Sequence, residues 1–224
     1  MPARTSHKAR PLSVSDIPAD KPIVTLDIDG VLNAFDHGKR LRSWQRPIED
    51  APTLFRINHR QRIRVPREMC ERHGYRYGQS FKITWSDDLM DAIEAAAKAG
   101  DATFVWLTSW NEFADLLGWR CFWRGRPSPV LGYLDCTQGG ASHAYTGKVG
   151  AFEELCWRME SAHPDGDIPG IVAFDDDKPW ESRMWNERGA QPMPAFFHGV
   201  GTDPRHGITK SQWDETMGLL GNAG

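Results

Sequence analysis

The sequence predicts an α/β protein whose core is a mostly parallel sheet flanked by helices. Short apolar runs rich in β-branched and aromatic residues alternate with longer segments that repeat apolar residues at helical spacing. This alternation is typical of βαβ units, in which each helix returns the chain so that successive strands run parallel. Polar residues follow directly after three of the apolar runs, at the strand ends where parallel sheets bind ligands.

Length and composition fit one domain that carries an insertion. The chain has 224 residues, of which 40% are hydrophobic, enough for a buried core. No apolar run approaches the ~18 residues needed to cross a membrane, and the N-terminus lacks the apolar stretch of a secretory signal. The cysteines show no C-x-x-C pair, so we expect reduced thiols in a cytoplasmic protein, with neither disulfides nor a zinc site.

The predicted elements follow one another in βα order after a polar N-terminal arm. Residues 1–20 show no periodicity and are expected to be flexible. The predicted strands span residues 22–28, 103–107, 170–174 and 194–200, with a short additional strand at 130–131. The predicted helices span residues 87–99, 111–117, 148–160, 179–188 and 210–220.

Boundary residues support several of these helices. Ser86 is placed to cap the helix at 87–99, and Gly100 stands where a left-handed residue would end it. Gly118 is expected to stop the helix that begins near residue 111, and Thr209 to cap the last helix. The complete order of elements predicts a Rossmann-like parallel sheet.

Residues 34–83 differ from the rest and are predicted to form a small basic cap inserted after the first strand. Polar and apolar residues alternate over 54–57 and 62–65, which predicts a β-hairpin ended by Pro66, and residues 75–83 can add a further strand. The predicted organisation is therefore an arm (1–20), a core (21–33 and 84–224) and the cap.

Charge is distributed unevenly between this insertion and the body. Residues 36–82 hold twelve Lys and Arg but only five Asp and Glu, whereas the whole chain has a net charge of −3. A basic insertion on an acidic body favours an anionic partner, and a solvated arginine-rich surface is the alternative. The arginines expected to contact such a partner are Arg56, Arg60, Arg62 and Arg64.

Carboxylates cluster at the predicted carboxyl ends of the strands. Asp27 and Asp29 follow the first strand, start on the same face, and are followed by Gly30, which we interpret as a turn. Two such carboxylates repel each other unless a cation lies between them, and Mg²⁺ prefers oxygen ligands. The alternative is an ordinary strand exit with two solvated aspartates, but Asp175 and Asp176 end another predicted strand at the same edge.

Four motifs resemble those of the haloacid dehalogenase-like superfamily, most of whose members are Mg²⁺-dependent phosphohydrolases. They occur in the family's order: the Asp27–Asn33 segment, Thr108 at the end of a strand, Lys148 at a helix start, and the Asp175–Asp176 pair. Segments 83–86, 106–111 and 202–209 are also similar to a small bacterial and phage subgroup, related to domains of RNA-repair proteins.

The resemblance implies a role for each matching residue. Asp27 would attack the phosphoryl group as nucleophile, and Asp29 would serve as general acid and then base. Mg²⁺ would be held by Asp27, the backbone carbonyl of Asp29, and Asp175 or Asp176 (Asp177 being the neighbouring alternative). The residues implied to bind phosphate are Thr108, Ser109, Lys148 and Gly30, with Lys178 as a rival to Lys148 and helix capping as an alternative for Ser109.

We therefore expect a phosphomonoester hydrolase that uses an aspartyl-phosphate and acts on an anionic substrate such as a nucleotide or the end of an RNA or DNA strand. A phosphotransferase would use the same intermediate but pass the phosphoryl group to an acceptor other than water. The remaining alternative is an idle scaffold that binds nucleic acid or a protein partner. The complete Asp27, Asp29 and Asp175 set favours an enzyme, because a binding module has no need of it.

Overall fold

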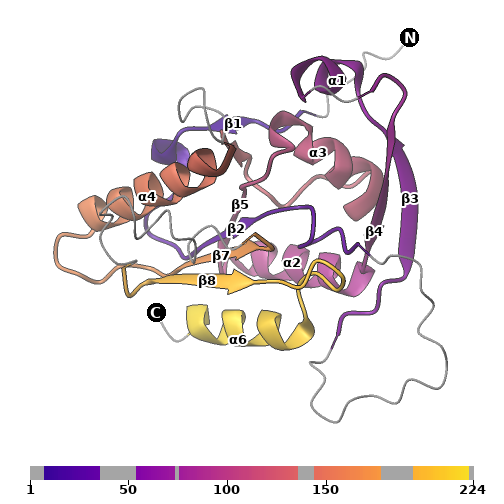
Figure 1. The fold of residues 1–224 in the computed structure, drawn as a ribbon. Helices are drawn as coiled ribbons and strands as arrows, with labels where there is room; N and C mark the ends of the chain where they lie inside the picture. The colour runs from indigo at the N-terminus through magenta and orange to yellow at the C-terminus, as the bar shows by residue number, and fades with distance from the viewer. Residues whose placement is uncertain (1–7, 36–53, 74–75, 136–143, 178–193, 222–224) are drawn as a thin grey trace.

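The computed structural model describes residues 8–35, 54–73, 76–135, 144–177 and 194–221. Its centre is a six-stranded sheet with the order β1-β6-β5-β2-β7-β8, in which every neighbouring pair is parallel (Figure 1). The strands are β1 Pro11–Leu12, β2 Ile23–Leu26, β5 Thr103–Trp106, β6 Tyr133–Leu134, β7 Ile171–Asp175 and β8 Phe197–Gly201. The predicted α/β class with a parallel sheet is thus confirmed.

Helices cover both faces of this sheet. Val24 and Leu26 of β2 belong to a hydrophobic cluster that includes residues of α2 (Asp87–Ala99), α3 (Ala114–Leu117) and α6 (Lys210–Gly221). Ile23 points to the opposite face, where α4 (Ala144–Ala162) and the N-terminal segment complete a second cluster. The three layers follow from alternation along buried strands, which are apolar on both faces.

The central strands and the flanking helices lie close to the predicted positions. Gly100 ends α2 in the left-handed conformation, with φ 80°, as expected. Thr209 also caps α6, because its hydroxyl accepts a hydrogen bond from the backbone N–H of Gln212 at 3.1 Å. The predicted helix at 179–188 lies outside the described residues.

Two predicted boundaries are wrong. The short strand lies at Tyr133–Leu134 rather than at 130–131. Gly118 does not stop the helix, which continues through a π-helical turn over Gly118–Phe122. A side chain at Gly118 would meet the Trp123 ring at 3.0 Å, so this glycine provides room for an indole rather than a helix end.

The predicted N-terminal arm is also wrong for its described part, residues 8–20. β1 pairs with β6 at the edge of the sheet, and a 3-10 turn follows at Val14–Asp16. Leu12, Val14 and Ile17 are buried in the second hydrophobic cluster. Burial of these three side chains offsets the entropy lost on ordering the segment, so tertiary contacts hold it in place.

The insertion forms a separate two-stranded antiparallel sheet, but its predicted hairpin is wrong. β3 (His59–Arg64) pairs with β4 (Ser80–Trp85), and helix α1 (Arg67–His73) lies between them in sequence. Residues 58–61, expected to form the turn between the two strands, are largely part of β3, while residues 54–57 form no strand. The further strand expected at 75–83 corresponds to β4, and β3 ends before Pro66 as expected.

The described residues of the insertion share the hydrophobic core of the body. Ile63, Val65, Ile83 and Trp85 are buried in the same hydrophobic cluster as α2 and α3. β4 also runs across the predicted boundary at 83/84 and leads through Ser86 directly into α2. The two-stranded sheet is therefore packed against the body rather than attached as an independently folded cap.

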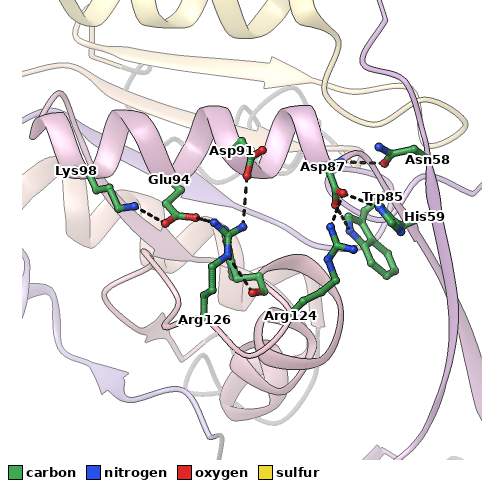
Figure 2. Close-up of polar contacts among 10 residues, drawn as sticks. Asn58, His59, Trp85, Asp87, Asp91, Glu94, Lys98, Arg124 and Arg126 are labelled. Atoms are coloured by element: carbon green, nitrogen blue, oxygen red, sulfur yellow. Dashed lines mark hydrogen bonds and ion pairs between the residues drawn. The ribbon is translucent and has the colours of Figure 1, made fainter.

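A polar network ties the start of β3 to the start of α2 (Figure 2). The Asp87 carboxylate contacts His59 Nε2 at 2.6 Å and accepts a hydrogen bond from Arg124 at 2.5 Å. The Asp87 backbone N–H donates to Asn58 Oδ1 at 3.0 Å, whereas the Ser86 side chain makes no capping bond. The predicted Ser86 cap is thus replaced by Asn58, a residue of the insertion.

Candidate functional site

The candidate site lies at the carboxyl edge of the sheet, where β2 and β7 end side by side. Leu26 is paired with Phe174, so the residues that follow, Asp27 and Asp175, emerge from neighbouring strands. The backbone N–H of Asp27 donates to the carbonyl of Phe174 at 3.1 Å, which extends the pairing to the site itself. Asp27 is 6% exposed and Asp175 is 1% exposed.

Lys148 joins these two carboxylates from α4. Its Nζ lies 2.7 Å from Asp27 Oδ2 and 2.6 Å from Asp175 Oδ2. The other oxygens are also held: Asp27 Oδ1 accepts from the Ile28 N–H at 2.6 Å, and Asp175 Oδ1 from the Asp177 N–H at 3.0 Å. The lysine implied by the family's motif order is therefore in contact with the expected nucleophile.

The site has more negative than positive charge among these groups. Burial alone would lower the pKa of Lys148, but the charges of Asp27 and Asp175 outweigh burial and raise it. Burial raises the pKa of Asp175 to about 6, against the opposing effect of Lys148. Burial, together with the neighbouring carboxylates, raises the pKa of Asp176 to about 6. A single lysine thus leaves the cluster short of positive charge.

Three carboxylates of this cluster can together hold a cation. One oxygen each from Asp27, Asp175 and Asp176 lies within 4.8 Å of the others. Opposite ligands of a six-coordinate Mg²⁺ are about 4.2 Å apart, so small side-chain rotations bring these oxygens to its distances. The donor set and the excess negative charge both fit a hard divalent cation. Asp177 is exposed and lies outside this group of carboxylates.

Gly30 makes the close approach of Asp176 possible. Its φ is 75°, and a Cβ at this position would lie 2.3 Å from Asp176 Oδ2. The carbonyl of Gly30 accepts a hydrogen bond from the Thr202 hydroxyl at 2.8 Å, and Ile208 N–H donates to the Val31 carbonyl at 3.0 Å. The 202–208 loop, to which the sequence assigns no role, therefore supports the turn that follows Asp27.

Asp29 is placed apart from the three clustered carboxylates. Its Oδ1 accepts a hydrogen bond from Asn33 Nδ2 at 2.7 Å, and its Oδ2 accepts one from Trp110 Nε1 at 2.9 Å. Burial raises the pKa of Asp29, although both hydrogen bonds oppose that shift. The side chain is thus no part of the cation group, and metal binding by the Asp29 backbone carbonyl stays a prediction.

The two expected hydroxyl ligands differ in their access to solvent. Thr108 has no exposed surface, and its hydroxyl lies 3.4 Å from the Trp110 backbone N–H. Ser109 is exposed and is not a helix cap, because Trp110 occupies the cap position of the 3-10 turn Asn111–Phe113. A phosphate contact is therefore open to Ser109, whereas Thr108 would first need a local opening.

The arginines of β3 lie on the exposed face of that strand. Ile63 pairs with Phe81, and the Phe81 ring packs edge-on against Trp110 at 5.5 Å, so the Ile63 face of the two-stranded sheet is the one that contacts Trp110. Strand alternation places Arg60, Arg62 and Arg64 on the opposite, exposed face. Arg56 is also exposed, in the segment before β3.

Three residues beside Asp29 are not among the predicted site residues. Asn33 is the one with a local signal, since it lies four residues after Asp29 within the same tight turn. No role is assigned to Trp110 or Phe81 from the sequence, because their relation to Asp29 depends on tertiary structure.

We expect Asp176→Asn to stabilise the metal-free protein, because it removes a half-buried negative charge. A pKa of about 6, raised from 3.8, corresponds to about 3 kcal/mol, reduced by solvent screening to about 1 kcal/mol. The gain should be present at pH 7.5, decrease as the pH falls below about 6, and vanish below 3.8, where folded and unfolded states are both protonated. Urea unfolding at several pH values measures it.

Asp177→Asn is the matched control, because Asp177 is adjacent but outside the cation group. With added Mg²⁺ the wild type should become more stable to unfolding than Asp176→Asn, since the wild type gains binding energy that Asp176→Asn loses. Equal Mg²⁺ stabilisation of the wild type and Asp176→Asn would contradict a cation site at Asp176.

Comparisons with known proteins give no match. No protein-family model matches the chain, and no curated protein or solved structure is similar enough to count as a relative. The resemblance to the haloacid dehalogenase-like motifs therefore stays a prediction made from the residues. Among the described residues, no helix has both the length and the apolar character needed to cross a membrane.

Proposed function

We propose that the chain is a Mg²⁺-dependent phosphomonoester hydrolase of the haloacid dehalogenase type that works through an aspartyl-phosphate on Asp27. The observation that carries the proposal is the buried Lys148 shared by Asp27 and Asp175, with Asp176 beside them at the carboxyl edge of the sheet. A structural ion pair needs one carboxylate, whereas here two carboxylates share one ammonium group and a third lies beside them.

The first half of the reaction forms a bond from an Asp27 oxygen to phosphorus as the bond to the leaving oxygen breaks. Lys148 orients Asp27, because its ammonium contacts Oδ2 at 2.7 Å. Asp29 gives its proton to the leaving oxygen, and the pKa raised by burial suits that task. When bound by Asp27, Asp175 and Asp176, Mg²⁺ would offset the negative charge of the phosphoryl group.

The second half releases phosphate and restores the enzyme. Asp29 takes a proton from a water molecule as that water attacks phosphorus, and the bond to Asp27 breaks. A phosphotransferase would differ only in the acceptor, with an alcohol in place of water. Product analysis in the presence of added alcohols separates these two functions.

The proposed substrates are phosphorylated anions of the nucleotide or nucleic-acid-end class. The support is the excess of seven positive charges over residues 36–82. Because Arg60, Arg62 and Arg64 are exposed on the strand face opposite to the Phe81 contact with Trp110, we assign them a field effect on anion approach rather than contact with the reacting phosphate.

Phosphate release from a panel of phosphomonoesters tests the proposal. The wild type should hydrolyse members of the panel with Mg²⁺, and metal removal by EDTA should lower the rate by about 10³-fold. Added Mg²⁺ should restore it, and circular dichroism should show that the fold persists without metal. A folded protein that is inert across the panel with Mg²⁺, or equally active in EDTA, would contradict the proposal.

A further inference from the structure

Both oxygens of the Asp29 carboxylate are fixed by side-chain donors from different parts of the chain. Asn33 lies in the turn that follows β2 and donates to Oδ1 at 2.7 Å, while Trp110 follows β5 and donates to Oδ2 at 2.9 Å. A carboxylate oxygen can accept two hydrogen bonds, so each oxygen retains a free position. The two donors therefore fix the orientation of the carboxyl group without using up its capacity to exchange a proton.

The same two donors are held by a single strand of the insertion. The Asn33 side-chain carbonyl accepts a hydrogen bond from the backbone N–H of Thr84 at 2.9 Å. The Trp110 ring packs edge-on against Phe81, with an interplanar angle of 70°. Thr84 and Phe81 both belong to β4, so this strand contacts both Asn33 and Trp110. We call these two hydrogen-bond donors the Asp29 clamp.

β4 is itself firmly anchored close to these contacts. The Thr84 hydroxyl donates to the Ala34 carbonyl, and the Ala34 backbone N–H donates to the Thr84 carbonyl at 3.1 Å. At the end of the strand, Trp85 is 3% exposed and stacks on His59 at 5.2 Å. A displacement of β4 would therefore move Asn33 and Trp110 together with it.

We propose that Asn33 and Trp110 are positioning residues that fix the carboxyl group of Asp29 for proton transfer to the leaving group, and that β4 couples the insertion to this step. The inference rests on the proposed function, because it assigns a device to the same reaction. It adds that the basic insertion acts on the chemistry through Phe81 and Thr84 of β4, which contact Trp110 and Asn33.

The leaving group supplies a test that a merely structural role would not satisfy. An alkyl phosphate needs a proton on its leaving oxygen, whereas p-nitrophenyl phosphate releases an anion that is stable without one. Trp110→Phe removes the indole N–H and keeps an aromatic ring beside Phe81. We expect kcat for the alkyl phosphate to fall about 10²-fold, and kcat for p-nitrophenyl phosphate to change little.

Trp106→Phe is a matched control within the same fold. Trp106 is fully buried, and its indole N–H donates to Asp115 Oδ1 at 2.9 Å, so the same substitution removes an equivalent hydrogen bond away from Asp29. We expect it to change the two rates by the same factor. Phe81→Leu leaves Trp110 intact but weakens its support. It should also lower kcat for the alkyl phosphate more than kcat for p-nitrophenyl phosphate, by a smaller factor than Trp110→Phe.

The outcomes separate the inference from the function on which it rests. Loss of the alkyl phosphate reaction alone, in both Trp110→Phe and Phe81→Leu, supports the clamp and its coupling to β4. Equal losses for the two substrates, or no loss in either variant, would overturn the clamp while the phosphatase function stands. A wild type that hydrolyses neither substrate would overturn both.

Discussion

Asp27→Asn is expected to lower kcat/KM for phosphomonoesters by about 10⁴-fold or more, because the amide cannot form the covalent phosphoenzyme. The fold should survive, since Asn has nearly the same shape and Lys148 keeps its contact with Asp175 at 2.6 Å. Steady-state phosphate release measures the loss. Acid quenching during turnover, followed by mass spectrometry of the intact chain, should find a phosphoryl group on the wild type and none on the variant.

Asp101→Asn is the control for this substitution. Asp101 is exposed in the turn that leads into β5, at the opposite edge of the sheet from Asp27, so the charge change is the same but the site is untouched. An Asp27→Asn protein with the activity of Asp101→Asn would exclude Asp27 as the nucleophile.

The core of the fold could be predicted because its signals are local. Buried parallel strands are continuous apolar runs, as at residues 171–174 of β7, and their order along the chain already implies βαβ units. β1 could not be predicted in this way. It is two residues long and begins with a proline, and it is held by the burial of Leu12 against the sheet.

The pairing of β3 shows a different limit. Alternation of polar and apolar residues indicates a strand but does not show with which strand it pairs, and here α1 separates β3 from β4. The face that each arginine occupies depends on that pairing. The sequence therefore indicates a basic insertion but cannot show that Arg60, Arg62 and Arg64 lie opposite to the face that contacts Trp110.

The residues of the candidate site also fall into two groups, those that local sequence signals place and those that only tertiary contacts place. Asp27, Asp175 and Lys148 are brought together by strand order and helix placement, which the motif order anticipates. The contacts of Trp110 and Asn33 with Asp29 depend on exact side-chain directions in a folded chain, and no spacing rule encodes them.

Lys148→Met should combine loss of activity with a large loss of stability. The substitution leaves Asp27 and Asp175 buried side by side without their shared cation. Removing one partner of a buried ion pair costs about 3–5 kcal/mol, so we expect a pronounced fall in Tm at pH 8. Lys148→Arg keeps the charge and serves as the control, with a smaller change expected.

The pH dependence of that loss distinguishes an electrostatic from a packing effect. In the wild type the pKa of Asp175 is already raised to about 6 by burial, and loss of the lysine raises it further. The carboxylates of Lys148→Met therefore take up protons as the pH falls from 8 to 5.5, and the repulsion between them is relieved. The difference in Tm between variant and wild type should be smaller at pH 5.5 than at pH 8.

Added Mg²⁺ should also recover part of this stability at pH 8, because a cation held by Asp27, Asp175 and Asp176 replaces some of the missing positive charge. Thermal unfolding of both proteins across a Mg²⁺ titration measures the recovery. A Tm difference that is independent of both pH and Mg²⁺ would mean that Lys148 acts through the packing of its aliphatic chain, and that the carboxylates are not held together by charge.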